Sequence, residues 1–151
     1  MRMKGKKPIF NRKDTWSLND VLSPIIAEGL KKFLEVKRSE KGEWFGVPGG
    51  AIEEYQKRNE LPIDGWHADN ETLKEADKVW EEILEKMIYA FENKEPNPDD
   101  YGYNIEFKDG KMVITGNVLE RKRYAKDVTI HENKVKEGHE LFGKFYNNLW
   151  W

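Results

Sequence analysis

Three glutamates in the middle of the chain have the residue type and spacing that could hold a metal ion. Glu81, Glu82 and Glu85 form an EExxE pattern in a helical segment, where residues three and four apart share a face. Carboxylates so arranged suit a hard cation such as Mg²⁺. Glu82 and Glu85 also lie opposite the apolar stripe of that segment, so the simpler interpretation is a solvated helix face. A Mg²⁺-dependent, all-α nucleotide hydrolase is the alternative hypothesis.

The chain offers few other groups for catalysis. It has no cysteine, which excludes disulfides, thiolate zinc sites, iron–sulfur clusters and cysteine nucleophiles. His67, His131 and His139 form no HExxH motif, and we interpret them as surface residues. No GxSxG-like elbow surrounds any serine. We therefore expect a binding protein without a cofactor rather than an enzyme.

Aromatic and basic side chains are the better candidates for a site. The segment Glu43–Trp66 has more apolar area than a solvated loop needs, and a basic cluster begins at Arg121. Aromatic and arginine side chains anchor many protein interfaces. The same groups could bind a nucleic acid or a small nucleotide, since cations neutralise phosphates and rings stack on bases. The candidate binding residues are Trp44, Phe45, Tyr55, Trp66, Arg121 and Arg123.

Three long helices must position these residues. Apolar side chains recur at three- and four-residue spacing over Leu18–Val36, Thr72–Asn93 and Asn133–Trp150. Such spacing puts the apolar side chains of each helix on one face, so the three faces should meet in one core. The expected aromatic anchors of that core are Trp16, Trp80 and Trp150.

Local signals refine the helices. Thr72 with Glu75 predicts a capping box at the start of the second long helix. Pro24 predicts a kink in the first one, or a restart capped by Ser23. A further short helix is expected over Ala51–Asn59.

A β-hairpin is predicted over Tyr103–Thr115, because Asp109-Gly110 separates two alternating runs. A two-residue turn there pairs Phe107 with Met112 and Ile105 with Ile114, with all four side chains on one face. A two-stranded ribbon is not stable alone, so we expect it to pack on the helices or gain a third strand from Ala125–Ile130.

The predicted fold is mainly α (α+β): a compact helical domain of three main helices with an inserted β-hairpin. The chain has 151 residues and a net charge of −2, yet residues 1–13 hold six basic residues and no acid. We expect a basic, flexible arm over 1–13 and a single helical domain over 14–151, with insertions at about 42–68 and 96–130. No apolar run suits a signal peptide or a membrane span, so we expect no membrane partner.

Three pieces of the sequence occur together in a distinctive order. They are Asp14-Thr15-Trp16-Ser17-Leu18, Trp80-Glu81-Glu82-Ile83-Leu84, and Leu141-Phe142-Gly143-Lys144 followed by Asn148-Leu149-Trp150. This set resembles a family of small, uncharacterised tailed-bacteriophage proteins with the order TWSL … EEW-x-x-IL-x-x-MI-x-AFE … LFGKY-x-x-NLW.

The resemblance implies a phage product acting in the cytoplasm of the infected bacterial host cell, and it implies no catalytic residue. We therefore expect a non-catalytic phage protein that binds a bacterial host protein, in host takeover or counter-defence. The two insertions are the expected location of its special function, because loops on a rigid scaffold often carry recognition. The alternatives are the Mg²⁺-dependent hydrolase and a protein that sequesters a small nucleotide.

Overall fold

Helices dominate the protein, and two hairpins project from them. The computed structural model describes residues 1–39, 46–63, 68–102 and 104–149. Its elements, in chain order, are β1 (Arg2–Lys4), β2 (Lys7–Ile9), α1 (Leu18–Lys37), α2 (Gly49–Arg58), α3 (Asn70–Glu92), η2 (Pro98–Tyr101), β3 (Asn104–Lys108), β4 (Lys111–Thr115), α4 (Val118–Phe145) and η3 (Tyr146–Asn148). This architecture confirms the predicted fold class, mainly α with a β-hairpin.

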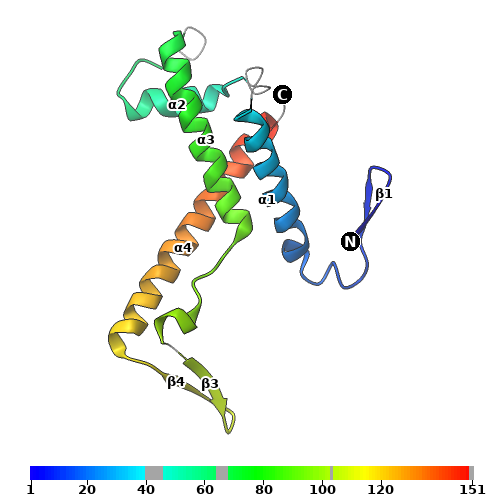
Figure 1. Ribbon diagram of the computed structural model, residues 1–151, viewed down its shortest axis with the longest axis vertical. Helices are drawn as coiled ribbons and strands as arrows, with labels where there is room; N and C mark the ends of the chain where they lie inside the picture. The colour runs from blue at the N-terminus through cyan, green and yellow to red at the C-terminus, as the bar shows by residue number, and fades with distance from the viewer. Residues whose placement is uncertain (40–45, 64–67, 103, 150–151) are drawn as a thin grey trace.

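The helix α3 lies at the centre and packs against α1, α2 and α4 (Figure 1). Its apolar stripe is the middle of the core, where the Trp80 side chain is only 1% exposed. The Trp80 ring meets the Phe145 ring of α4 with the centroids 5.3 Å apart. Leu30 and Leu34 of α1 and Ala51 of α2 complete the same buried cluster. The prediction of one core shared by the long helices is therefore confirmed.

The crossing of α3 and α4 depends on Gly138. A Cβ atom at this position would lie 2.4 Å from the Cβ atom of Ala90 and 2.4 Å from the carbonyl oxygen of Lys86. Only glycine permits this approach without a shift of one backbone. The two longest helices are thus joined where there is no room for a side chain.

Two of the three predicted core anchors can be compared with the structure, and one of them is wrong. Trp80 is buried, whereas the Trp16 side chain is 88% exposed. Trp16 lies in the turn that precedes α1, and its side chain does not reach the core that was predicted from its aromatic character. The third anchor, Trp150, lies outside the described residues.

The local signals at the helix starts are confirmed only in part. The helix α1 begins at Leu18 as predicted and continues through Pro24, so the restart capped by Ser23 is wrong; the helix gives up the hydrogen bond to the carbonyl of Asp20. The N-cap of α3 is Asp69, whose side chain accepts a hydrogen bond from the Thr72 nitrogen at 2.7 Å. The predicted Thr72 capping box is therefore wrong, because an earlier acid takes the capping position.

The largest difference lies in α4, which begins at Val118 instead of near Asn133. The segment Ala125–Ile130, predicted as a third strand, is helical. The Asn117 side chain accepts a hydrogen bond from the Leu119 nitrogen at 3.0 Å and caps the new start. The first turns are rich in charged residues and lack apolar periodicity, so the sequence pattern did not reveal them.

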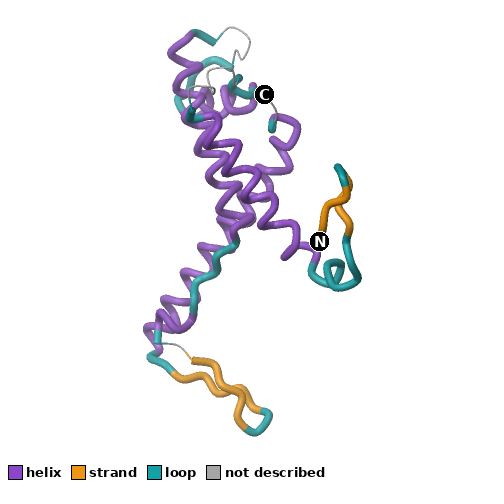
Figure 2. Tube along the Cα trace, turned by 45° about the vertical axis from the view of Figure 1, so that its right-hand side comes forward, coloured by secondary structure: helices purple, strands orange, loops and turns teal. Residues whose placement is uncertain are grey.

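The hairpins stand away from the helical body in both views (Figures 1 and 2). In the β3–β4 hairpin, Phe107 pairs with Met112 and Ile105 with Ile114, which confirms the predicted register. The β1–β2 hairpin was not foreseen; it lies within the predicted arm of residues 1–13. The flexibility of that arm and the single-domain division stay predictions. None of the described helices has the length and apolarity needed to cross a membrane.

Candidate protein-interaction surface

The EExxE glutamates of α3 are bound by cations from neighbouring helices. Arg38 of α1 donates from Nε to Glu81 at 2.8 Å and from Nη2 to Glu85 at 2.6 Å. Arg58 of α2 donates from Nη1 to Glu82 at 2.8 Å. Across the described ranges, no group of three or more histidine, aspartate or glutamate side chains is arranged to hold a metal ion. The geometry favours a structural role for this motif.

The pKa values of two of these carboxyls agree with that role. Partial burial alone would raise the pKa of Glu81, but hydrogen bonds from Arg38 and Lys37 outweigh it and hold the pKa below 4.5. The hydrogen bond from Arg58 lowers the pKa of Glu82 in the same direction. The ion pairs thus keep the carboxylates charged and attach α1 and α2 to α3.

The histidines differ in environment. His131 is buried, so its interpretation as a surface residue is wrong. Its Nδ1 lies 2.8 Å from the Tyr89 hydroxyl, and its Nε2 lies 3.2 Å from Oδ1 of Asn93. The tautomer with hydrogen on Nε2 satisfies both contacts, because the Asn93 oxygen can only accept. His139 is exposed, with its ring edge-on to Phe91 at 4.9 Å, and His67 lies outside the described residues.

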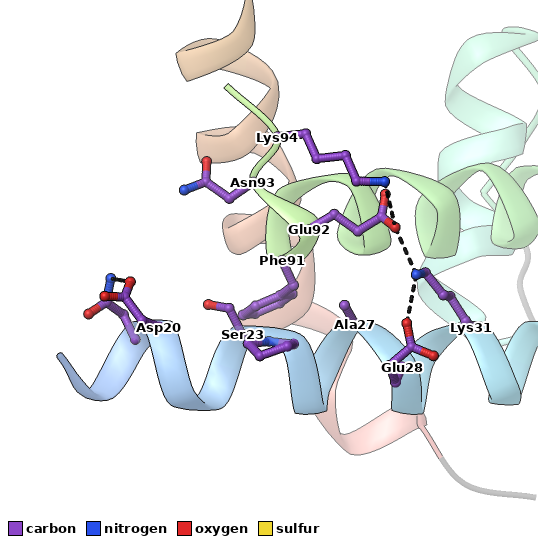
Figure 3. A pocket seen from close by; sticks show the side chains of 11 residues that line it. Asp20, Ser23, Ala27, Glu28, Lys31, Phe91, Glu92, Asn93 and Lys94 are labelled. Carbon is purple, nitrogen blue, oxygen red and sulfur yellow. Dashed lines mark hydrogen bonds and ion pairs between the residues drawn. The ribbon is translucent and has the colours of Figure 1, made fainter. Parts of the chain in front are cut away.

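A groove of about 390 Å³ lies between α1 and the end of α3 (Figure 3). Its charged groups are paired across it: the Lys31 ammonium is 2.7 Å from both Glu28 and Glu92, and the Lys94 ammonium is 3.3 Å from Glu92. The hydrogen bond from Lys31 is the main reason that the pKa of Glu92 is lowered. Since these lysines already bind carboxylates, the groove gives little support to the binding of an anionic nucleotide.

Exposed apolar side chains are concentrated in another part of the molecule, the β3–β4 hairpin and the start of α4. We call residues 104–127 the hairpin arm; it comprises β3, β4 and the first turns of α4. The Phe107 side chain is 77% exposed, Met112 is 56% exposed and Leu119 is 71% exposed. Among the described elements, each strand of the hairpin packs mainly on the other. One face of the ribbon is therefore apolar and largely uncovered.

The base of the hairpin arm is fixed to α4. The Tyr101 hydroxyl of η2 donates to Oδ2 of Asp127 at 2.7 Å. The Tyr101 ring packs edge-on against Tyr124 with the centroids 5.3 Å apart. The Arg123 guanidinium lies over the Tyr101 ring, 5.4 Å from its centroid. These interactions attach η2, which precedes β3 in the chain, to α4.

The hairpin arm also has basic side chains without internal partners. Lys111, Lys122 and Lys126 form no ion pair with any residue in the described ranges. The Nε atom of Arg121 is buried and has no hydrogen-bond partner there either. Arg123 lies 3.7 Å from Glu120, which is a weak pairing. The hairpin arm therefore has more cationic groups than its own carboxylates neutralise.

The predicted binding residues do not form one site. Arg121 and Arg123 belong to the hairpin arm, whereas Tyr55 packs partly buried against the core on α2, at the far end of α3 (Figure 1). Trp44, Phe45 and Trp66 lie outside the described residues. Phe107, Met112 and Leu119 were missed as site residues. The alternation of the hairpin had placed the first two on one face, but the sequence could not show that the described part of the chain leaves that face largely exposed.

Comparisons of the chain with family models, with curated proteins and with solved structures found no match.

Proposed function

We propose that this chain is a non-catalytic bacteriophage protein that binds a bacterial host protein through the hairpin arm, in host takeover or counter-defence within the infected cell. The observation that carries the proposal is the exposed apolar surface of the arm: Phe107 and Met112 on one face of the ribbon, and Leu119 in the first turn of α4, are each more than half exposed. The phage origin rests on the resemblance of the sequence to the phage family.

The physics of a two-stranded ribbon supports an interface. A lone hairpin is marginally stable in water and gains stability when its apolar face is covered. Contiguous exposed apolar patches usually mark interaction sites. Phe107 and Met112 lie directly opposite each other in the ladder, so a partner would meet them as one anchor. Removal of such an anchor typically weakens binding by about 2 kcal/mol or more.

The charge of the hairpin arm indicates the chemistry of the partner. Lys111, Lys122 and Lys126 belong to the hairpin arm and form no ion pairs with described residues; Lys111 lies on the ribbon face opposite to Phe107 and Met112. A partner surface with an apolar strip flanked by carboxylates would complement both features and would associate faster at low ionic strength. A second copy of the chain would bring like charges together at this end. An acidic host protein is therefore the partner that we propose.

The test is affinity capture from a bacterial lysate with the wild-type chain and with F107S/M112S. The matched control is I63S/Y146S, which also removes two exposed apolar side chains, but outside the hairpin arm. We expect a host protein to be retained by the wild type and by the control and to be absent with F107S/M112S. The dissociation constant is then measured with the purified host protein by calorimetry.

Three results would contradict the proposal. The arm variant could retain the same host protein as the wild type, or both double variants could fail equally to retain it. Light scattering that shows a dimer disrupted by F107S/M112S would instead assign the apolar face to self-association. Circular dichroism of each variant, recorded beforehand, verifies that the capture experiment compares folded proteins.

A further inference from the structure

The N-terminal end of the molecule has a second exposed surface with different chemistry. It consists of the β1–β2 hairpin and the turn of residues 11–16 that leads into α1. We propose that this surface, which we call the N-terminal surface, binds single-stranded nucleic acid. Its cations would contact phosphates, and the Trp16 indole would stack on a base. The inference is independent of the hairpin arm, from which the N-terminal surface is separated in both views (Figures 1 and 2).

The first observation is an excess of cations without internal partners. Six basic side chains are exposed here, and none forms an ion pair with a residue in the described ranges; they are Arg2, Lys4, Lys6, Lys7, Arg12 and Lys13. The nearby acid is Asp14, and its carboxylate lies 2.9 Å from the amine of Met1 and accepts from the Asn11 nitrogen at 2.7 Å. It therefore does not neutralise the lysines.

The register of the hairpin makes this excess unfavourable within the protein itself. Lys4 lies directly opposite Lys7 in the ladder, and Arg2 lies opposite Ile9, so three cations share one face. Like charges directly opposite each other destabilise an antiparallel pair. An anion bound along that face would remove the repulsion. A row of phosphates carries such charge at regular spacing.

The second observation is the way in which Trp16 is held. The side chain is 88% exposed, although an indole normally loses most of its exposure to water on folding. The turn before it is fixed by hydrogen bonds: Oδ1 of Asn11 accepts from the Lys13 nitrogen at 2.8 Å and from the Asp14 nitrogen at 3.0 Å. The Trp16 nitrogen donates to the Lys13 carbonyl at 3.2 Å. The indole is thus presented from a hydrogen-bonded turn that also contains the exposed residues Arg12 and Lys13.

The combination of an exposed indole and cationic side chains suits single-stranded nucleic acid better than a duplex or a lipid surface. Bases of a single strand have free faces that stack on an aromatic side chain, whereas those of a duplex already stack on each other. A lipid surface would require a broader apolar face, because membrane-bound amphipathic segments bury several large side chains. The exposed face of the β1–β2 ribbon instead carries Arg2, Lys4 and Lys7.

The experiment measures the fluorescence anisotropy of a labelled oligothymidylate of about 20 nucleotides titrated with the full chain. Removal of one stacking interaction corresponds to about tenfold weaker binding, which we expect for W16A. W16F keeps a stacking ring and should bind nearly as well as the wild type. K4E/K7E should weaken binding and reduce the salt dependence, by about 0.7 in the slope of log K against log salt for each phosphate that the protein no longer neutralises.

The matched controls are Y146A, which removes another exposed ring, and K57E/K74E, which reverses two exposed lysines on α2 and α3. Both should bind the oligonucleotide like the wild type. The proposal is overturned if W16A binds as well as the wild type, or if K57E/K74E weakens binding as much as K4E/K7E does. It is also overturned if a DNA duplex binds more tightly than the single strand, or if vesicles of phosphatidylserine and phosphatidylcholine bind while the oligonucleotide does not.

Discussion

Along α4, the stretch from His131 to Phe145 and the stretch from Val118 to Ile130 have opposite surroundings. In the first, His131, Gly138 and Phe145 are buried against α3. In the second, Val118, Leu119 and Ile130 are exposed, although all three are apolar. The backbone hydrogen bonds of the helix are the same in both stretches, so helix formation alone does not determine what a segment does. The neighbours supplied by the rest of the chain determine it.

Charges show the same contrast. In the body, carboxylates of α3 meet cations of α1 and α2, so most of these charges are consumed in holding helices together. In the hairpin arm, Lys122 and Lys126 have no such partner among the described residues. The packed part of α1–α4 therefore uses its charged and apolar groups in contacts between helices. The hairpin arm leaves such groups exposed, where a partner could contact them. Substitutions should separate the two regions by their effect on stability.

The largest effect is expected for W80A in the body. The indole is buried against Phe145, so its removal should cost about 3–5 kcal/mol in the free energy of unfolding. Urea denaturation followed by circular dichroism measures this quantity. W16A removes the same ring from an exposed position and should change it by less than about 0.5 kcal/mol. Equal losses would show that exposure does not distinguish the two indoles.

The next effect is expected for G138A. The added methyl group would collide with Ala90 and with the Lys86 carbonyl, so the helices must separate, at a cost of about 3 kcal/mol. G143A is the control, because a Cβ atom there has no neighbour within 4 Å. Alanine is the better helix former, and G143A should be neutral or more stable by about 0.5–1 kcal/mol. A stable G138A protein would refute the close crossing of α3 and α4.

A smaller effect on stability is expected when the pH is lowered. The folded-state pKa values of Glu81, Glu82 and Glu92 lie below the ordinary 4.5. Their contribution to the free energy of unfolding is therefore fully present above about pH 4.5. It is lost as the pH falls through the folded-state pKa values. The melting temperature, measured from pH 6 to pH 3, should fall in that window. R58M, which removes the partner of Glu82, should lower stability at pH 6 by about 0.5 kcal/mol and flatten the fall. A steeper fall in R58M would contradict this assignment.

The smallest effect on stability is expected for F107S/M112S in the hairpin arm. Both side chains are more than half exposed, so the free energy of unfolding should change by about 0.5 kcal/mol or less. The same variant is expected to lose binding of the host partner while it keeps its stability, whereas W80A is expected to lose stability. A fall in melting temperature of many degrees would show that the apolar face is covered within the protein and would remove the basis for the interface.

Local sequence patterns predicted the parts of the fold that depend on local physics. Asp109-Gly110 determines a turn in which both residues take positive φ, at 51° and 71°, and the register of β3 and β4 follows from it. The apolar periodicity of α3 is strong and its burial was correctly expected. The start of α4 was missed, because its first turns depend on the Asn117 cap and have few apolar residues.

The site was less predictable, because exposure depends on what the rest of the chain leaves uncovered. Trp16 and Trp80 are the same residue type, yet one is presented to solvent and the other fills the core. His131 is a polar residue in a polar stretch, and only its distant partners Tyr89 and Asn93 explain its burial. The EExxE motif has the spacing of a possible metal site in the sequence. In the structure, its glutamates form ion pairs with Arg38 and Arg58, which the fold brings close to them.

Because α4 is long, a small change in how it packs against α3 would move the hairpin by a larger distance. The helix has 28 residues, so at 1.5 Å per residue it is a rod of about 42 Å. Gly138 marks a close approach to α3, and the root of the hairpin arm at Val118 is about 30 Å away along that rod. A tilt of α4 by about 5° at that point would move the root by about 2.6 Å, nearly the length of a hydrogen bond. The position of the hairpin therefore depends on how α4 packs against α3, far from the hairpin itself.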